Sequence, residues 1–230
     1  MRLNKYIASK TGLSRRHADY LIDRGLVLIN NEVATLGQKL TDSDQIEFSD
    51  PETNQHYSLA VDLNSKTQTT TIILNKPVGY VCSRDGQGSD TVYDLLPKDF
   101  ASLKIAGRLD KDSSGLVLLS DDGELINELT HPKYQKTKVY DVQLDQPLEP
   151  LHQQIITDTG ISLDDGLSKF VIEKIADSAK NIRITMHEGR NRQIRRTFEA
   201  LGYKIAKLHR TNLGSYQLKN LMTGRHKIIN

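Results

Sequence analysis

The sequence predicts a protein of mixed α-helix and β-strand structure that is built in two parts. Residues 2–48 have apolar spacings typical of two helices followed by short strands. From residue 71 onward, short alternating or continuous apolar runs are typical of strands, and helical segments lie between them. A chain of 230 residues with 37% hydrophobic residues is long enough for one small and one medium-sized domain.

The N-terminal part begins with two predicted helices. Apolar residues of helical spacing over 3–7 predict the first helix. Ser14 is a suitable N-cap for a second helix over 15–24, because its hydroxyl can accept a hydrogen bond from a free backbone N–H group. Gly25 provides the stop signal for that helix. Short strands are expected next, at 26–29 and 46–48.

A polar stretch separates the two parts. Residues 49–71 contain a proline, two asparagines and a threonine-rich end, which are typical of a linker. Apolar residues alternate between positions 57 and 63, so an edge strand is the alternative for this stretch. We place the N-terminal domain at 1–60, with the linker within about 49–70, and the C-terminal domain at 71–230.

The apolar pattern of the C-terminal part predicts many short elements. Strands are expected at 72–74, 80–83, 104–106, 116–119, 136–144, on either side of a turn at 164–166, at 181–186 and at 203–210. Helices are expected at 91–96, 124–129, 147–156 and 191–201, the last with Asn191 as its cap. In strand 136–144, Tyr140 shares a face with Val142 and Leu144, so we expect its ring on the core side.

The turn between predicted strands 104–106 and 116–119 is the strongest candidate for a site. It contains Asp110 among closely spaced glycine and serine residues. Loops held between rigid strands often carry function. An aspartate there can act as a nucleophile or as a general base.

The same region raises an alternative, a Mg²⁺ site for phosphoryl transfer. Asp112, Asp121 and Asp122 could supply the oxygen ligands that Mg²⁺ prefers. Asp110 and Asp112 stand beside the cations Arg108 and Lys111, and the Asp-Asp-Gly sequence at 121–123 is typical of a turn and a helix cap. We therefore disfavour the metal site.

Basic residues are concentrated in two segments, although the net charge is only +2. Residues 1–24 contain six Lys or Arg and two Asp, and residues 181–210 contain eight Lys or Arg and two Glu. Arginines at the start of the predicted helix 191–201 are electrostatically unfavourable, because the helix dipole is already positive there. The two segments indicate a polyanionic partner that is contacted at two places. Ordinary solvated helix faces are the alternative.

Composition excludes several classes of protein. The single cysteine, Cys82, allows no internal disulfide and no cysteine-based metal cluster. The sequence near residue 1 lacks the apolar core of a signal peptide, and no run approaches the roughly 20 apolar residues of a membrane span. We expect a cytoplasmic protein that does not enter a membrane.

Four motifs resemble those of pseudouridine synthases, in the same order along the chain: ILNKPVGYV, GRLDKDSSGLVLLSDDGEL, KTKVYDV and EGRNRQIRR. The N-terminal segments RLNKYIA, SRRHAD and VLINNEVA resemble an S4-type RNA-binding domain. The chain is therefore similar, over nearly its whole length, to the RsuA/RluB/RluE/RluF family of bacterial ribosomal RNA pseudouridine synthases.

The resemblance implies a role for each matching residue. Asp110 would attack a flipped-out uridine, Tyr140 would stack on its base and assist proton removal from C5, and Arg195 would form an ion pair with Asp110. The substrate-binding residues would be Arg108, which would hold the flipped nucleotide, Ile194, which would offer an apolar wall, and Lys76, which would brace the wall of the site. The candidate RNA contacts are Lys5, Arg15, Arg16, Arg24, Arg190, Arg192 and Arg196.

The resemblance also implies the fold and the partners. The fold would be α+β, with a small S4-like domain and a catalytic domain whose mixed, largely antiparallel sheet has flanking helices. The partner would be ribosomal RNA or a pre-ribosomal particle, more in keeping with the large subunit than the small one. We expect a monomer that needs no cofactor and no metal. The alternative function is that of a non-catalytic RNA-binding or ribosome-assembly factor.

Overall fold

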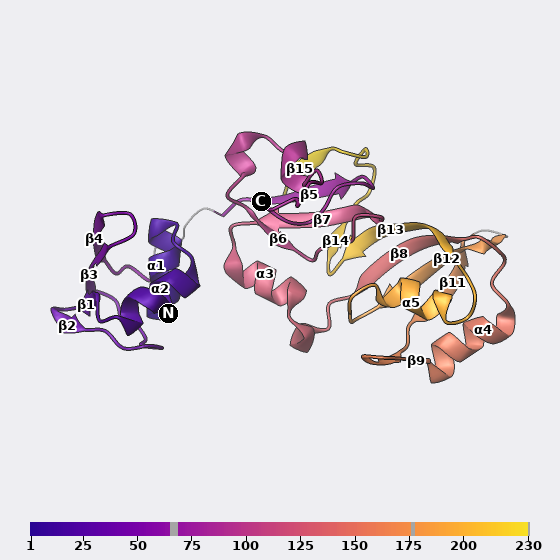
Figure 1. Cartoon of the computed structure of the whole chain (residues 1–230), viewed down its shortest axis with the longest axis horizontal. Helices are drawn as coiled ribbons and strands as arrows, with labels where there is room; N and C mark the ends of the chain where they lie inside the picture. Colours follow the sequence, from indigo (N-terminus) through magenta and orange to yellow (C-terminus); the bar gives the residue numbers. More distant parts are fainter. Residues whose placement is uncertain (65–68, 176–177, 230) are drawn as a thin grey trace. The chain divides into compact units, whose positions relative to one another are not determined.

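The computed structural model describes residues 1–64, 69–175 and 178–229. The chain divides into two compact units, 1–68 and 69–230 (Figure 1). We call them the N-terminal unit and, after the resemblance described above, the catalytic unit.

The N-terminal unit packs two helices against a four-stranded antiparallel sheet. Its elements are α1 (Leu3–Thr11), α2 (Arg15–Asp23), β1 (Val27–Ile29), β2 (Glu32–Val33), β3 (Gln45–Asp50) and β4 (Gln55–Ala60), and the strand order is β2-β1-β3-β4. The Ser14 hydroxyl accepts a hydrogen bond from the backbone N–H of His17, as expected for the N-cap of α2. The two predicted helices are thus confirmed.

Residues 49–60 are not a linker. Strand β4 lies at the edge of the sheet and pairs with β3 over its whole length. The rings of Phe48 and Tyr57, which are opposite each other in this pair, stack with centroids 4.6 Å apart. The alternation that suggested an edge strand therefore identifies β4 correctly, and the polar composition misled because only one face of an edge strand is buried.

The catalytic unit is built on a nine-stranded mixed sheet, drawn from purple to yellow in Figure 1. Its strands follow the order β11-β12-β8-β13-β7-β5-β15, and β6 and β14 pair with β7 and β13 at the sides of this path. The strand bounds are β5 (Thr71–Lys76), β6 (Lys104–Ala106), β7 (Ser114–Ser120), β8 (Lys138–Leu144), β11 (Val171–Ile175), β12 (Ser178–Met186), β13 (Ile205–Leu213), β14 (Tyr216–Gln217) and β15 (His226–Ile228). The β7–β13 pair is parallel and the others are antiparallel, which confirms the predicted α+β class.

Strands β5 and β7 are covered on both faces of the sheet. Their apolar residues are buried on both faces, because one face contributes to the main core and the other to a smaller core beneath α3. The helices are α3 (Gly123–Thr130), α4 (Pro150–Gln154), which continues as a π-helical turn to Thr159, and α5 (Gln193–Glu199). A separate hairpin is formed by β9 (Ile161–Leu163) and β10 (Gly166–Ser168).

Three local expectations need correction. The strand expected at 80–83 is reduced to a single bridge between Val81 and Thr91, and the helix expected at 91–96 is a 3₁₀ turn at Val92–Leu95. Helix α5 is capped by Arg192 rather than Asn191, and Arg192 has the left-handed φ of 47°.

No helix in the described ranges is long and apolar enough to cross a membrane.

Candidate active site

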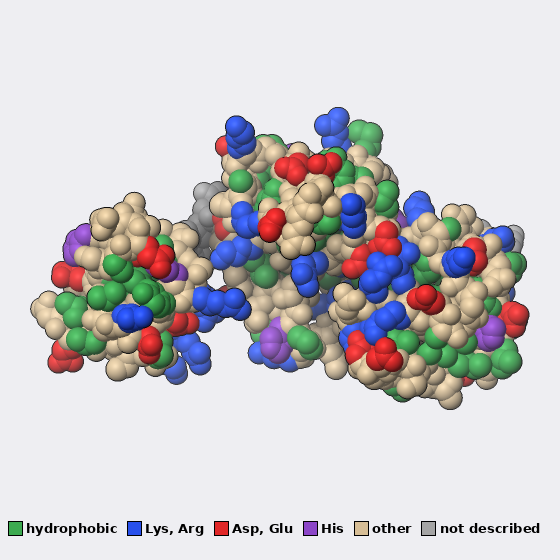
Figure 2. All heavy atoms as spheres, in the orientation of Figure 1, with side chains coloured by type: hydrophobic (Ala, Val, Ile, Leu, Met, Phe, Trp, Pro, Cys, Tyr) green, Lys and Arg blue, Asp and Glu red, His purple; other side chains and the backbone are tan. Residues whose placement is uncertain are grey.

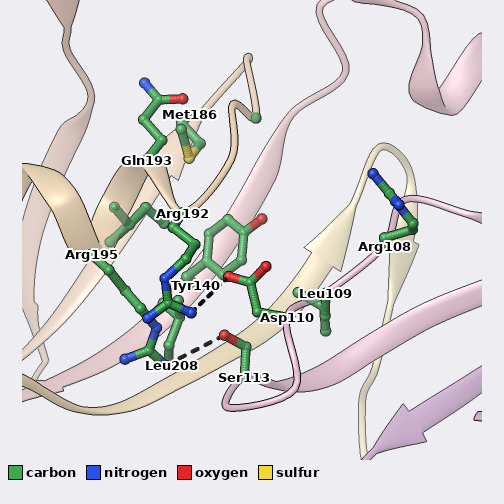
Figure 3. Close-up of a pocket in the computed structure, with 12 residues that line it drawn as sticks. Arg108, Leu109, Asp110, Ser113, Tyr140, Met186, Arg192, Gln193, Arg195 and Leu208 are labelled. Atoms are coloured by element: carbon green, nitrogen blue, oxygen red, sulfur yellow. Dashed lines mark hydrogen bonds and ion pairs between the residues drawn. The ribbon is translucent and has the colours of Figure 1, made fainter. Parts of the chain in front are cut away.

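One pocket of the catalytic unit brings together the residues that the sequence motifs singled out (Figure 3). Its lining is Arg108, Leu109, Asp110, Ser113, Tyr140, Met186, Gly189, Arg192, Gln193, Ile194, Arg195 and Leu208. The loop between β6 and β7 carries Arg108 and Asp110, β8 carries Tyr140, and the segment from the end of β12 into α5 carries Arg192 and Arg195. These residues meet because β12, β8, β13 and β7 are neighbours in the sheet.

A buried arginine, Arg210, holds the loop that carries Asp110. Arg210, on β13, is 1% exposed. Its Nε donates a hydrogen bond to the carbonyl of Leu116 at 2.8 Å, and its Nη2 donates to the carbonyl of Gly107 at 2.5 Å. A single guanidinium thus ties together the two ends of the loop that carries Asp110.

The backbones of β7 and β13 approach each other closely where Gly115 lies opposite Arg210. A Cβ atom at Gly115 would lie 2.2 Å from the carbonyl oxygen of Arg210, and the φ of Gly115 is 108°. Only glycine satisfies both the contact and the backbone conformation.

Lys76 is a second buried cation beneath the loop. It is fully buried, and its Nζ donates hydrogen bonds to the carbonyls of Ser113 at 2.6 Å and Pro77 at 2.9 Å. Burial lowers the pKa of Lys76 from its ordinary value. Lys76 does not line the pocket, and its hydrogen bond to the Ser113 carbonyl braces the Asp110 loop, in keeping with the bracing role that the resemblance implies.

The expected ion pair between Asp110 and Arg195 is not formed. In the part of the chain that the structure describes, the ion pair of Asp110 is with Arg192, whose Nη1 lies 3.7 Å from the carboxylate Oδ2. Arg195 lies in the pocket with its Nε 3.2 Å from Oδ2 of Asp112. Sequence spacing could not separate the two arginines, because both lie at the start of α5 and reach the same loop.

Asp112 forms ion pairs with both arginines at the start of α5, Arg192 and Arg195. Its carboxylate accepts two hydrogen bonds from Arg192, each 3.1 Å long. Burial alone would raise the pKa of Asp112, but the hydrogen bonds from Arg192 and the nearby charge of Arg195 outweigh it and hold the pKa below its usual range. Asp112 is therefore ionised at neutral pH and forms ion pairs with both arginines.

The carboxylates at the end of β7 also have structural partners. Asp121 accepts a hydrogen bond from the backbone N–H of Thr70, and Asp122 caps α3 through the N–H groups of Glu124 and Leu125. No group of three metal-ligating side chains is found among the described residues.

Apolar side chains form the remainder of the pocket. Tyr140 is 7% exposed, and its ring stands beside the Asp110 carboxylate in Figure 3. Ile194 and Leu208 are also buried and line the pocket. Leu208 and Met186 were not predicted as site residues, because their alternation within β13 and β12 signals only burial. A wall of this kind can hold a flat, partly apolar ring against the carboxylate.

Two predicted RNA contacts are engaged elsewhere. Arg196 donates hydrogen bonds of 3.1 and 2.7 Å to the carboxylate of Asp165, at the tip of the β9–β10 hairpin, and Arg190 donates to the same residue at 2.8 Å. Figure 2 shows the result over α5, where basic and acidic side chains lie against each other. These two arginines hold the hairpin, so the structure does not present them as free RNA contacts.

Arg192, another predicted RNA contact, is paired with Asp112. The predicted substrate-binding residue Arg108 and the RNA contacts predicted in the N-terminal unit are at least partly exposed. Arg108 is exposed and lies on the opposite side of Asp110 from Arg192 and Arg195 (Figure 3). In the N-terminal unit, Arg15, Arg16 and Arg24 are exposed and Lys5 is half-buried. The Arg24 guanidinium lies over the ring of Tyr20 at 5.3 Å.

Comparisons with known proteins agree with this site. The sequence profile of the family described as RNA pseudouridylate synthase matches residues 70–200, and that of the S4 domain matches residues 1–46. The chain belongs to the RNA pseudouridylate synthase family and carries an S4 domain at its N-terminus.

Individual relatives match over almost the entire chain. The ribosomal large subunit pseudouridine synthase B of Bacillus subtilis is 38% identical, covering 97% of this chain and 89% of the relative. The ribosomal small subunit pseudouridine synthase A of Pasteurella multocida is 35% identical, covering 100% of this chain and 96% of the relative. A crystal structure of a pseudouridylate synthase matches with a TM-score of 0.67 at 32% identity, covering 100% of this chain and 96% of that one.

Proposed function

We propose that this chain isomerises a uridine of ribosomal RNA to pseudouridine, with Asp110 as the nucleophile. The observation that carries the proposal is that one pocket contains Asp110, Tyr140 and Arg195, which come from three distant motifs. The relatives that match over nearly the whole chain are named as ribosomal pseudouridine synthases, which supports ribosomal RNA as the substrate.

The reaction requires a nucleophile that is free to attack. The Asp110 carboxylate adds to the uridine at its sugar or its base, and the glycosidic bond from C1′ to N1 breaks. The freed uracil turns so that C5 bonds to C1′ and Asp110 is released. N1 gains a proton, and C5 loses its own. Tyr140 stacks on the base and assists this last proton transfer.

The target nucleotide must leave its stack to reach the pocket. Flipping costs about a few kcal/mol and is cheapest in loops and single strands. Arg108 is exposed on the far side of Asp110 from the other arginines, where it can occupy the vacated position. Ile194 and Leu208 supply the apolar wall for the base. Arg192 and Arg195 place positive charge against the loop that carries Asp110, and this charge attracts the RNA backbone.

The N-terminal unit would supply contacts that position the RNA without reading its sequence. Lys5, Arg15, Arg16 and Arg24 are our candidates for phosphate contacts. We favour large-subunit RNA as the substrate and a monomer acting in the cytoplasm. Mapping pseudouridines in the ribosomal RNA of a deletion strain would identify the uridine, and sedimentation of the full chain would test the monomer.

The decisive test uses the hydrogen that C5 must lose. Ribosomal RNA from a deletion strain, labelled with tritium at C5 of uridine, should release tritium to water with the wild-type chain and not with Asp110→Asn. The matched control is Asp141→Asn, because Asp141 lies on the opposite face of β8 from Tyr140 and should leave the rate unchanged. Full tritium release by a folded Asp110→Asn chain would refute Asp110 as nucleophile. A wild-type chain that binds the RNA and releases no tritium would favour a non-catalytic assembly factor.

A further inference from the structure

A lysine of β8 stands at the edge of the pocket. Lys138 comes two positions before Tyr140, so the two side chains share a face of the strand. Met186, its register partner on β12, lines the pocket. Gly189 lines it too, and a Cβ atom placed there would lie 3.4 Å from Cε and 3.8 Å from Nζ of Lys138. The Lys138 side chain therefore runs along the rim of the pocket, outside its interior.

The ammonium of Lys138 is only weakly engaged. Its Nζ donates to the backbone carbonyl of Lys136 at 3.3 Å and to that of His187 at 3.5 Å, the outer limit for such bonds. Among the described residues, no carboxylate lies within ion-pair distance of it, and Glu188, whose charge acts on it, is paired with Arg190 instead. An ammonium has three donors, so Lys138 can still donate to a ligand.

Three neighbouring guanidiniums are already engaged by the protein. Arg192 and Arg195 form ion pairs with Asp112. Arg210 is buried and donates hydrogen bonds to carbonyls at both ends of the catalytic loop. Burial and the nearby charge of Arg210 lower the pKa of Lys138, so its positive charge is not fully compensated by the surrounding protein. An anion bound at this place would compensate it.

A flipped nucleotide presents two different surfaces to this site. Its base enters the pocket, where Tyr140, Ile194 and Leu208 supply apolar walls. Its phosphate groups stay at the rim, because a full negative charge is costly to place against apolar side chains. We propose that Lys138 binds a backbone phosphate next to the target uridine through its ammonium. The proposal rests on the proposed function, because its ligand is RNA with a flipped uridine.

The chemistry of lysine suits this ligand. Its ammonium is a compact charge with three rotatable donors, and phosphate contacts fix the position of a nucleic acid without reading its sequence. Beside Met186 and Gly189, the contact fixes the sugar–phosphate backbone on the side of the pocket that β8 and β12 form. Lys138 thus orients the nucleotide, and Asp110 performs the chemistry.

The test is the salt dependence of substrate binding. Each phosphate contact displaces counterions from the RNA, so loss of one contact reduces the slope of log affinity against log salt concentration by about 0.7–0.9. Lys138→Met keeps the apolar stem of the side chain and removes the ammonium. In single-turnover tritium release from the labelled ribosomal RNA, the RNA concentration for half-maximal rate should rise about tenfold at about 50 mM KCl, with the shallower slope up to about 200 mM. The rate at saturating RNA should stay near that of the wild type.

Two variants separate the charge from the packing. Lys138→Arg keeps a cation at the rim and should retain the wild-type slope. Lys180→Met is the matched control, because Lys180 also donates to a backbone carbonyl, that of Asp145, but lies toward the other end of β12 from Met186. It should change neither the slope nor the RNA concentration for half-maximal rate.

The outcomes distinguish a phosphate contact from its alternatives. A folded Lys138→Met chain with the wild-type slope would overturn the proposal, whether its half-maximal concentration rises, as for a contact with the base, or only its stability in urea falls, as for a structural clamp. An equal change of slope in Lys180→Met would overturn it as well. Absence of tritium release by the wild type would instead refute the proposed function. The slopes would then be compared by retention of the same RNA on filters, where equal slopes for the wild type and Lys138→Met would overturn the phosphate contact separately.

Discussion

Replacing Arg210 by Met should both destabilise the catalytic unit and misplace the nucleophile. The side chain is 1% exposed, and its guanidinium donates to the carbonyls of Leu116 and Gly107 at the two ends of the Asp110 loop. Met fills a similar volume and donates nothing, so both carbonyls lose their charged donor. Arg210→Lys is the matched variant, because a single ammonium keeps the charge without the fork that spans both carbonyls.

The magnitude follows from these two hydrogen bonds. Each hydrogen bond from a charged donor contributes about 1.5–3 kcal/mol to stability. Part of this loss is recovered, because the Met variant no longer has the desolvation cost of burying a charge. We expect a net loss of about 2–4 kcal/mol in the free energy of unfolding of the catalytic unit. The Asp110 loop would also no longer be fixed in position relative to β13. The rate should fall as well, because a shift of about 1 Å at a reacting group lowers a rate by roughly a hundredfold.

Two measurements check this prediction. The chain contains no Trp, so urea unfolding is best followed by circular dichroism, with hydrogen exchange of β7 peptides to isolate the catalytic unit. Tritium release from labelled RNA gives the rate. An Arg210→Met chain that loses less than about 1 kcal/mol and keeps its rate would show that the loop is held by other contacts.

Three further perturbations test other parts of the structure. Gly115→Ala places a Cβ against the Arg210 carbonyl at a positive φ, so the unfolding free energy of the catalytic unit should fall by about 3 kcal/mol or more; a loss below about 1 kcal/mol in urea unfolding would contradict the close approach. Burial lowers the pKa of Lys76, so the unfolded chain binds its proton more tightly than the folded chain, and the stability of the wild type relative to Lys76→Met should rise with pH between the lowered folded pKa and the ordinary value of 10.5. A pH-independent difference would contradict the buried charge. Ser168→Ala removes a buried hydroxyl that receives hydrogen bonds from Gln193 and Thr197, and it should cost about 1–3 kcal/mol in urea unfolding of the catalytic unit, whereas a change near zero would contradict this network.

The elements with strong periodicity and the positions of two residues of the pocket could be predicted from the sequence. Strand β8 was placed with Tyr140 on its core face, and Asp110 was placed in a tight turn between β6 and β7. These predictions succeeded because a period of two and a glycine-rich turn are local properties of the chain.

Pairing between distant residues could not be predicted in the same way. Arg192 and Arg195 reach the same loop, and only the structure shows that Asp112 accepts the hydrogen bonds from Arg192. The buried position of Arg210 had no sequence signal, because an arginine at the end of an apolar strand is normally solvent-exposed. The local sequence also gave no sign that Asp165 holds Arg196, since the two lie on separate elements.

The position of β13 has a consequence for when the protein becomes active during its synthesis. This strand lies between β7 and β8, so it joins the half of the sheet next to the Asp110 loop to the half that carries Tyr140 and α5 (Figure 1). Residues 205–213 leave the ribosome after every other strand that lines the pocket. The nascent chain therefore cannot assemble its active site until this late segment has emerged and paired on both sides.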